Sequence, residues 1–319
     1  MKTPRPKSHV YAPNVQPEPI SNDDIIRSFL LGLGGAGRVE KTLETYGQSL
    51  RMLVEFARAE GLPPLVQMKS DHLRYWFQSL YKRGNKPGSV SVRYRALNRF
   101  YNWAVREGEV AENPLDRVDP PRIPDEIQPW YRPEDVEKVL KAIGREGQRG
   151  IKVYQLRDTA MVLTLYDSGP RAAEVCGMRV QDIDWKHKTI MVTGKAGKQR
   201  RISIGARTAE AIDRYLRKRG VKGDILWLAS GPKPFTTNGL RMMLERRFQA
   251  AGVKFRGAHA FRRAFAMSYL AAGGQEGDLK ELGGWESFAM VSRYARGNAA
   301  ERAIDAHKKF SPGDRLRVQ

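Results

Sequence analysis

Cysteine is almost absent from this sequence. Its 319 residues include one cysteine, Cys176, which excludes an intramolecular disulfide and any zinc site built from several cysteine thiolates. A chain without disulfides is typical of a reducing compartment, so we expect the protein in the cytoplasm.

Long hydrophobic runs are also missing. No stretch approaches the roughly 18 consecutive apolar residues of a membrane-spanning helix, and residues 1–20 carry prolines and charges where a signal peptide has an apolar core. We therefore expect no association with a membrane. Hydrophobic residues still make up 41% of the sequence, which is enough for packed cores and argues against a largely disordered chain.

Acidic residues are scarce relative to basic ones. The sequence has 35 Asp and Glu against 56 Lys and Arg, which gives a formal net charge of +21 and a pI near 10.1. An excess of this size favours a polyanionic partner, most often nucleic acid, although some basic proteins are merely soluble.

Proline divides the chain into parts. Residues 1–20 contain five prolines with little hydrophobic periodicity, and we expect an extended or disordered arm there. Five more prolines fall between Pro114 and Pro129, which predicts a linker over residues 113–130. At roughly 150 residues per domain the length allows two domains, and we place them at 21–112 and 131–319.

The first domain has a helical pattern. Apolar residues recur at helical spacing over 21–30, 39–60, 70–83 and 89–107, which predicts four helices. The segment from Lys69 to Arg106 contains nine basic residues against one acidic residue, so we expect a one-sided basic surface. The basic residues are Lys69, Arg74, Lys82, Arg83, Lys86, Arg93, Arg95, Arg99 and Arg106.

The second domain is predicted to be mainly α with a small antiparallel β-sheet, which makes the whole chain a mostly helical α+β protein. Between Lys188 and Ile204 the hydrophobic period changes to two around a glycine-containing turn, the pattern of a hairpin. Helical patterns precede the hairpin near residues 133–140 and 158–166. They resume at 207–218, 239–251, 260–272, 279–282, 288–295 and 299–308.

The sequence from Gly32 to Gly37 matches the dinucleotide-binding pattern G-x-G-x-x-G. That pattern indicates a nucleotide site only when it follows a strand and opens a helix. Here the preceding segment has a helical pattern, so we interpret the glycines as a turn between helices.

The segment from Gly169 to Glu174 brings opposite charges to the start of a helix. Pro170 suits the first helical position, which places Arg171 in the first turn and Glu174 three residues later on the same face. Glu174 can then orient the Arg171 guanidinium. Taken alone, such a pair is more often a surface ion pair.

The hairpin turn concentrates positive charge. Lys195 and Lys198 lie in the glycine-containing loop and are followed at once by Arg200 and Arg201. A basic loop of this kind can enter a groove or donate a proton, and a solvated turn explains it equally well by itself.

Two further motifs lie near the C-terminal end. His259 and Arg262 stand three residues apart at a helix start, which directs an imidazole and a guanidinium to one point. Trp285 closes a Leu-Gly-Gly-Trp sequence, and Tyr294 follows nine residues later in a basic segment. A structural His–Arg pair and a packing tyrosine remain the alternatives.

In this order the motifs resemble the tyrosine recombinase or phage integrase family. The family has an Arg in Gly-x-Arg-x-x-Glu, a Lys in a Gly-Lys-x-x-Lys hairpin, His-x-x-Arg, a Leu-Gly-His/Trp element and a Tyr nine residues after it. Each motif is weak, but the ordered set from Gly169 to Tyr294 is specific. By resemblance the catalytic residues are Arg171, Lys195, His259, Arg262, Trp285 and Tyr294, with Glu174 in support.

Two positions depart from the commoner family pattern. Trp285 stands where most members have His, and Arg263 stands where His is frequent. Some members carry Trp at the first position, so the resemblance still implies activity, without a second imidazole. We assign no catalytic role to Arg263.

The resemblance implies a site-specific DNA recombinase that cuts and rejoins strands. Tyr294 would form a 3′-phosphotyrosyl link, while Arg171 and Arg262 would hold the non-bridging oxygens as fixed guanidinium forks. His259 would act as a base or hydrogen-bond partner, and Lys195 would protonate the leaving 5′-oxygen. No cofactor and no metal ion is expected, because the cations come from the protein.

The resemblance also implies partners. Double-stranded DNA would contact the basic residues from Lys69 to Arg99 in the 21–112 core-site-binding domain, together with Lys198, Arg200 and Arg201. The catalytic domain would occupy 131–319, and a homotetramer on two DNA sites would exchange a C-terminal helix over residues 298–310.

Two other functions fit the charge and part of the motifs. A type IB topoisomerase-like enzyme would share the nicking chemistry and relax supercoils as a monomer without a preferred site. A non-catalytic DNA-binding regulator would never become covalently attached to DNA.

Overall fold

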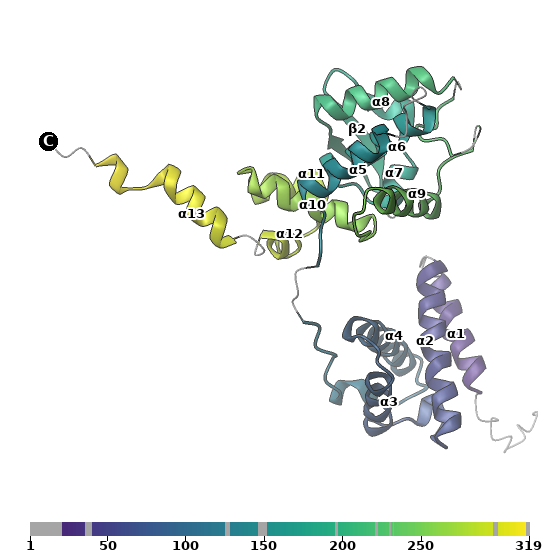
Figure 1. Ribbon diagram of the computed structural model, residues 1–319. Helices are drawn as coiled ribbons and strands as arrows, with labels where there is room; N and C mark the ends of the chain where they lie inside the picture. The colour runs from purple at the N-terminus through teal and green to yellow at the C-terminus, as the bar shows by residue number, and fades with distance from the viewer. Residues whose placement is uncertain are drawn as a thin grey trace, which may run out of the picture. The chain divides into compact units, whose positions relative to one another are not determined.

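The chain forms two compact units. The computed structural model describes residues 21–35, 40–124, 128–145, 152–194, 197–220, 223–229, 231, 233–295 and 299–316. Its contacts divide the chain into Met1–Asp125 and Glu126–Gln319 (Figure 1), each with its own hydrophobic core. The predicted arm at 1–20, the hairpin residue Lys195 and Asn298 lie outside the described residues.

Four helices form the described part of the N-terminal unit. They are α1 (Asn22–Gly35), α2 (Glu40–Ala59), α3 (Ser70–Lys82) and α4 (Pro87–Arg106), with the 3₁₀ turns η1 (Leu65–Gln67) and η2 (Pro114–Arg117). Phe29, Phe100 and Trp103 pack together where α1 meets α4. The helical periodicity of the sequence predicted all four helices, and their ends differ from the prediction by a few residues.

The proline-rich linker begins later than the sequence suggests. We expected it from residue 113, but Leu115 and Val118 are buried in the core of the N-terminal unit. The side chain of Asn113 caps η2 by accepting a hydrogen bond from the Leu115 N–H. Because the first turn of a helix tolerates proline, Pro114 continues the folded unit instead of ending it.

The glycine motif near residue 32 falls at the end of a helix. Gly32 and Gly35 are residues of α1, and the described residues before them belong to the same helix. The strand that a dinucleotide-binding turn must follow is therefore not found there.

The second unit surrounds a small sheet with helices. Before the sheet come α5 (Pro133–Arg145), α6 (Val153–Ser168), α7 (Ala172–Cys176) and η3 (Val180–Asp182). After it come α8 (Ala206–Lys218), α9 (Thr237–Ala250), α10 (His259–Ala271), α11 (Glu276–Gly283), α12 (Phe288–Ala295), α13 (Ala299–Phe310) and η6 (Gly313–Arg315). The predicted mainly α fold with a small antiparallel sheet is confirmed.

The sheet has three antiparallel strands in the order β1 (Ile183–Asp184), β2 (Thr189–Thr193) and β3 (Gln199–Ser203). Ile190 pairs with Ile202 across β2 and β3, and both are buried. The predicted hairpin is therefore confirmed. Strand β1 was not predicted, because two residues are too few for an alternating pattern to be recognised.

Helix α6 is the central helix of the second unit (Figure 1). It packs against α5, α8 and α10, and it is apolar on several faces. Its buried Asp158 accepts hydrogen bonds from Arg157 at 2.9 Å and from Arg247 of α9 at 2.8 Å. This polar link fixes α9 against α6. Helix α6 ends at Ser168, shortly before Arg171, the first of the predicted site residues.

A separate cluster joins the last helices to α10. Its buried members are Phe265, Ala266, Leu270, Leu279, Trp285 and Val291, and the half-buried Tyr294 packs against them. The cluster therefore positions Trp285 and Tyr294, the two predicted site residues of this region. Among the described helices, none is long and apolar enough to span a membrane.

Candidate active site

The site begins where α6 ends. Gly169 has a φ of +56° and caps α6 by donating its N–H to the Leu165 carbonyl. A Cβ at this position would lie 2.7 Å from the Phe265 ring, so the left-handed backbone and the close packing both require glycine. Pro170 follows, and Arg171 is the N-cap residue of α7, because the helix begins at Ala172, two residues later than expected.

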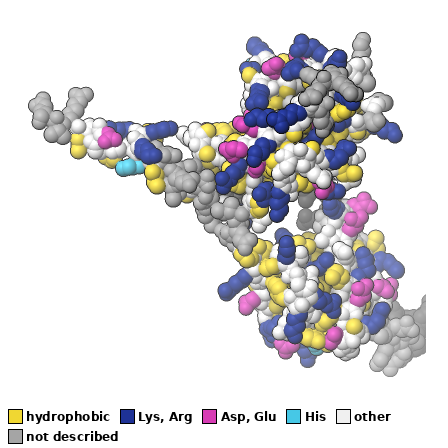
Figure 2. Space-filling model, viewed as in Figure 1, with side chains coloured by type: hydrophobic (Ala, Val, Ile, Leu, Met, Phe, Trp, Pro, Cys, Tyr) yellow, Lys and Arg dark blue, Asp and Glu magenta, His cyan; other side chains and the backbone are white. Residues whose placement is uncertain are grey.

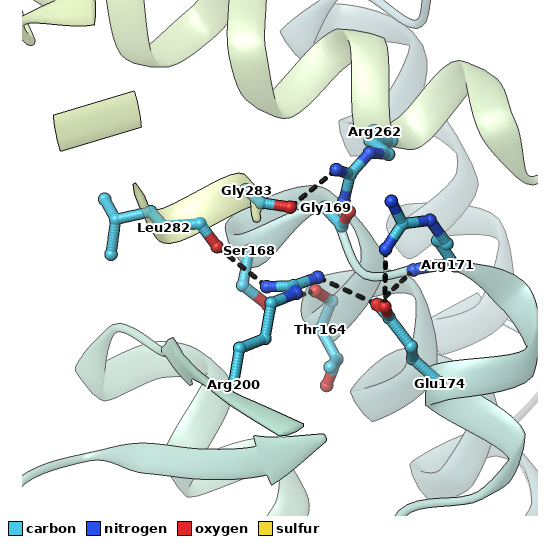
Figure 3. A network of polar contacts seen from close by, with 9 residues as sticks. All are labelled: Thr164, Ser168, Gly169, Arg171, Glu174, Arg200, Arg262, Leu282 and Gly283. Carbon is cyan, nitrogen blue, oxygen red and sulfur yellow. Dashed lines mark hydrogen bonds and ion pairs between the residues drawn. The ribbon is translucent and has the colours of Figure 1, made fainter. Parts of the chain in front are cut away.

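Glu174 holds two arginines with one buried carboxylate (Figure 3). Its side chain is 2% exposed. Oε1 accepts a hydrogen bond from Arg171 Nη1 at 2.8 Å, and Oε2 accepts one from the Arg171 backbone N–H and one from Arg200 Nη2, both at 2.8 Å. The Arg171 guanidinium is thus fixed along one edge while its side chain stays 46% exposed.

The surroundings of Glu174 keep it ionised. Burial alone would raise the pKa of this carboxyl. This effect is outweighed by the hydrogen bond from the Arg171 N–H, the charge of Arg200 and the Arg171 guanidinium. Together they hold the pKa of Glu174 below its usual range. The site therefore has a permanent negative charge that orients the two arginines.

Arg262 lies buried behind this pair. It is 2% exposed and donates Nη1 to the Gly169 carbonyl at 2.9 Å and Nη2 to the Gly283 carbonyl at 2.5 Å (Figure 3). Burial, followed by the charges of Arg171 and other neighbouring groups, lowers the pKa of Arg262 to about 10, so it stays protonated at neutral pH.

The Leu-Gly-Gly-Trp segment folds tightly under Arg262. A Cβ at Gly283 would overlap the Trp285 ring at 1.7 Å, and Gly284 caps α11 with a φ of +61°. The chain can therefore turn back so that Trp285, 4% exposed, lies 4.2 Å beneath the Arg262 guanidinium. Both glycines are needed to bring these two side chains together.

His259 opens α10 and is exposed on one side. Partial burial, then the charges of Arg263, Arg262 and Arg171, lower the pKa of its imidazole. The neutral imidazole can accept a proton or a hydrogen bond at neutral pH. Arg263 is half-buried and donates Nε to the Pro129 carbonyl at 2.9 Å, which ties α10 to the end of the linker.

Tyr294 lies on α12, close to this group. Its ring centroid is 5.5 Å from that of Trp285, with an interplanar angle of 54°. Burial lowers the pKa of Arg262 and of Arg263, the two arginines of α10 next to this region. Because Trp285 also lies against Arg262, the contact with Trp285 places the Tyr294 ring next to the buried arginine's aromatic partner.

The predicted basic residues of the hairpin differ in their exposure to solvent. Lys195 lies outside the described residues. Lys198 is exposed, with Nζ 3.7 Å from Glu286 Oε1, and Arg201 is exposed on β3. We predicted Arg200 as a DNA contact, but its side chain is 15% exposed and turns inward to Glu174.

Most of the basic residues predicted in the N-terminal unit are exposed. Those at the surface are Lys69, Arg74, Lys82, Arg83, Lys86, Arg95 and Arg106. Arg93 and Arg99 are half-buried, and Arg93 donates to Ser49 Oγ at 3.2 Å. Figure 2 shows Lys and Arg side chains spread over the visible face of each unit.

In the part of the chain that the structure describes, no three His, Cys, Asp or Glu side chains are grouped closely enough to hold a metal ion. The charged groups that meet at the site are mostly arginines, with Glu174 between two of them.

Sequence reasoning missed the acceptors that hold the arginines. The carbonyls of Gly169, Leu282 and Gly283 each accept a guanidinium hydrogen bond. Backbone carbonyls carry no side-chain signal, although the glycines of the two tight turns pointed to these segments. The inward direction of Arg200 follows from its pairing with Glu174, which only the fold reveals.

Both units of the chain are similar to known proteins. The chain matches the phage integrase family over residues 129–301 and the N-terminal SAM-like domain of phage integrases over residues 26–108. The tyrosine recombinase XerC of Halalkalibacterium halodurans is 28% identical over 309 residues, which cover 92% of this chain and 99% of that protein.

Two solved structures share the fold. The Tn1549 transposon integrase in complex with transposon right end DNA has a TM-score of 0.73 and 20% identity, over 90% of this chain and 99% of that one. The XerH site-specific recombinase bound to a palindromic difH substrate has a TM-score of 0.71 and 18% identity, over 92% and 85%. Because the family match extends over more than half of the chain and includes every described residue of the site, this protein belongs to the phage integrase family.

Proposed function

We propose that this protein is a site-specific DNA recombinase that cuts and rejoins DNA strands through a 3′-phosphotyrosyl intermediate. The observation that carries the proposal is the Arg171 guanidinium, held along one edge by a buried carboxylate and exposed on the other. Such a preorganised fork suits the non-bridging oxygens of a phosphate, whose charge increases during phosphoryl transfer.

In the proposed reaction the Tyr294 hydroxyl attacks the scissile phosphorus. The new O–P bond leaves the protein linked to the 3′ phosphate, and the bond to the 5′-oxygen breaks. Arg262 adds a second fixed positive charge beside Arg171, and the neutral His259 imidazole takes the tyrosine proton or bonds to the phosphate. Lys195 is the proposed donor of the proton to the leaving 5′-oxygen.

The covalent link conserves the energy of the broken bond, so a 5′-hydroxyl of a second strand can reverse the step without ATP. Trp285 contacts the Tyr294 ring and the Arg262 guanidinium. It takes the place of a second imidazole and orients the two groups by contact. No cofactor and no metal ion takes part in this scheme.

We further propose that the protein works as a tetramer on two duplex DNA sites in the cytoplasm. Helix α13 supports an exchange between protomers, since Ile304 and Phe310 are 60% and 65% exposed and lack the burial expected of such side chains. The basic residues between Lys69 and Arg106 of the N-terminal unit, with Lys198 and Arg201, provide contacts to the DNA backbone.

Replacing Tyr294 with Phe tests the nucleophile. Tyr294→Phe should abolish covalent protein–DNA complexes on nicked suicide substrates while DNA affinity stays within about threefold, because only the nucleophilic oxygen is removed. Tyr269→Phe, a half-buried tyrosine packed against the same cluster, is the matched control and should keep the covalent product. SDS-resistant complexes formed by Tyr294→Phe would refute the assignment.

The pH dependence tests His259. Because the pKa of His259 is lowered, its imidazole becomes protonated only at a pH below the ordinary value of about 6.5. The second-order rate constant for covalent complex formation should therefore fall only below that pH, and this acid limb should be absent in His259→Gln. His187→Gln, which removes an exposed histidine on the β1–β2 turn, should retain the limb. An acid limb that begins above pH 6.5 contradicts the proposed role.

Salt dependence tests the basic surface of the N-terminal unit. Arg95→Ala should reduce the slope of log affinity against log salt by about one unit, as expected for one lost phosphate contact. Arg27→Ala on α1, which removes an arginine paired with Asp24 at 3.4 Å, is the control and should leave the slope unchanged. Equal slopes for wild type and Arg95→Ala would mean that Arg95 is merely solvated.

A further inference from the structure

We propose that Arg200 is a positioning residue for DNA cleavage, which connects strand β3 and the C-terminal end of α11 to the carboxylate of Glu174. This inference rests on the proposed recombinase function and goes beyond it, because the resemblance assigns no catalytic role to this arginine.

Arg200 bridges two parts of the site that are distant in sequence. Nη2 donates to Glu174 Oε2 at 2.8 Å, and Nη1 donates to the Leu282 carbonyl at 2.7 Å (Figure 3). Glu174 also holds Arg171, so the position of α11 and the orientation of Arg171 depend on the same carboxylate.

The carbonyls of Leu282 and Gly283 are consecutive acceptors for two arginines. Arg200 takes the first and Arg262 takes the second. The chain after these carbonyls leads directly to Trp285, which lies beneath Arg262. Loss of the bond to Leu282 would leave only one of the two guanidinium contacts that fix this turn.

Arg200 is shielded from a bound phosphate. Its side chain is 15% exposed, and its Nε is buried with no hydrogen-bond partner among the described residues. A Cβ at Gly284 would lie 2.6 Å from Arg200 Cδ and 2.9 Å from Nε, so the backbone of the α11 cap packs directly against the arginine. Arg200 therefore acts through its protein contacts.

The position of Arg200 is unfavourable for a positive charge unless specific contacts compensate for its burial. Burial and the charge of Arg171 lower the pKa of Arg200, and Glu174 opposes them. A lysine would keep the charge but has no planar fork to reach two acceptors on different elements. Arginine is therefore required at this position mainly because it can form both hydrogen bonds at once. Its charge is of secondary importance.

Single-turnover cleavage of a nicked suicide substrate at saturating DNA tests the proposal. Arg200→Met should lower the rate constant for covalent complex formation by about 10²-fold, because small misplacements of reacting groups have effects of that size. DNA affinity should stay within about threefold. Arg200→Lys should recover only part of the rate, since it restores one of the two bonds.

The amplitude of the same reaction separates positioning from loss of folding. A partly unfolded population would lower the amount of covalent product and leave the rate constant unchanged, whereas misplacement lowers the rate constant. Arg217→Met is the control, because it removes an exposed arginine paired with Asp213 on α8 and should match wild type in rate and amplitude. If Arg200→Met does not fold, Arg200→Lys, which keeps the charge beside Glu174, carries the test.

Three outcomes would overturn the proposal. A wild-type rate constant in both Arg200 variants would make the two hydrogen bonds irrelevant to cleavage. A parallel loss of DNA affinity and rate would indicate a direct DNA contact, and a loss of amplitude alone would indicate a purely structural role. Failure of the wild-type protein itself to form a covalent complex would refute the recombinase function instead, which keeps the two failures distinguishable.

Discussion

The ion pairs of one buried carboxylate are the interaction on which the rest of the site depends. Glu174 is 2% exposed and receives hydrogen bonds from the Arg171 backbone, the Arg171 guanidinium and Arg200. Removing one partner of a buried ion pair generally costs about 3–5 kcal/mol. Because its partners come from the start of α7 and from β3, and Arg200 reaches on to α11, the carboxylate makes three elements adopt one relative position.

The described residues of the site carry more positive than negative charge, which favours the binding of an anion. Burial lowers the pKa of Arg262 to about 10 and the neighbouring arginines contribute, yet the group keeps its proton at neutral pH. Glu174 pairs with Arg171 and Arg200, while Arg262 is held by backbone carbonyls, so a phosphate bound beside Arg171 would relieve the repulsion among these positive charges. Holding these charges in place before DNA binds reduces the reorganisation needed in the transition state, which explains why Arg262 is anchored to two backbone carbonyls.

Much of this arrangement can be predicted from the sequence, and the limits have physical causes. Helical and alternating periodicities identify the four N-terminal helices and the β2–β3 hairpin, because burial of one face leaves a repeat in the sequence. The motif order indicates which side chains belong to the site. The linker boundary was misplaced since Pro114 begins a 3₁₀ turn whose Leu115 is buried. The inward direction of Arg200 depends on contacts between segments far apart in the chain, which no local pattern records.

The role of Glu174 is tested most directly by the single-turnover rate of covalent complex formation by Glu174→Gln at saturating DNA. Glutamine keeps the shape, but it loses the charge and places an amide donor against a guanidinium. If Glu174 organises the site, the rate constant should fall by about 10²-fold or more with DNA affinity nearly unchanged, while Glu245→Gln, on the exposed face of α9, should cleave like wild type. A wild-type rate for Glu174→Gln, in protein that remains folded, would contradict the claim that this carboxylate organises the site.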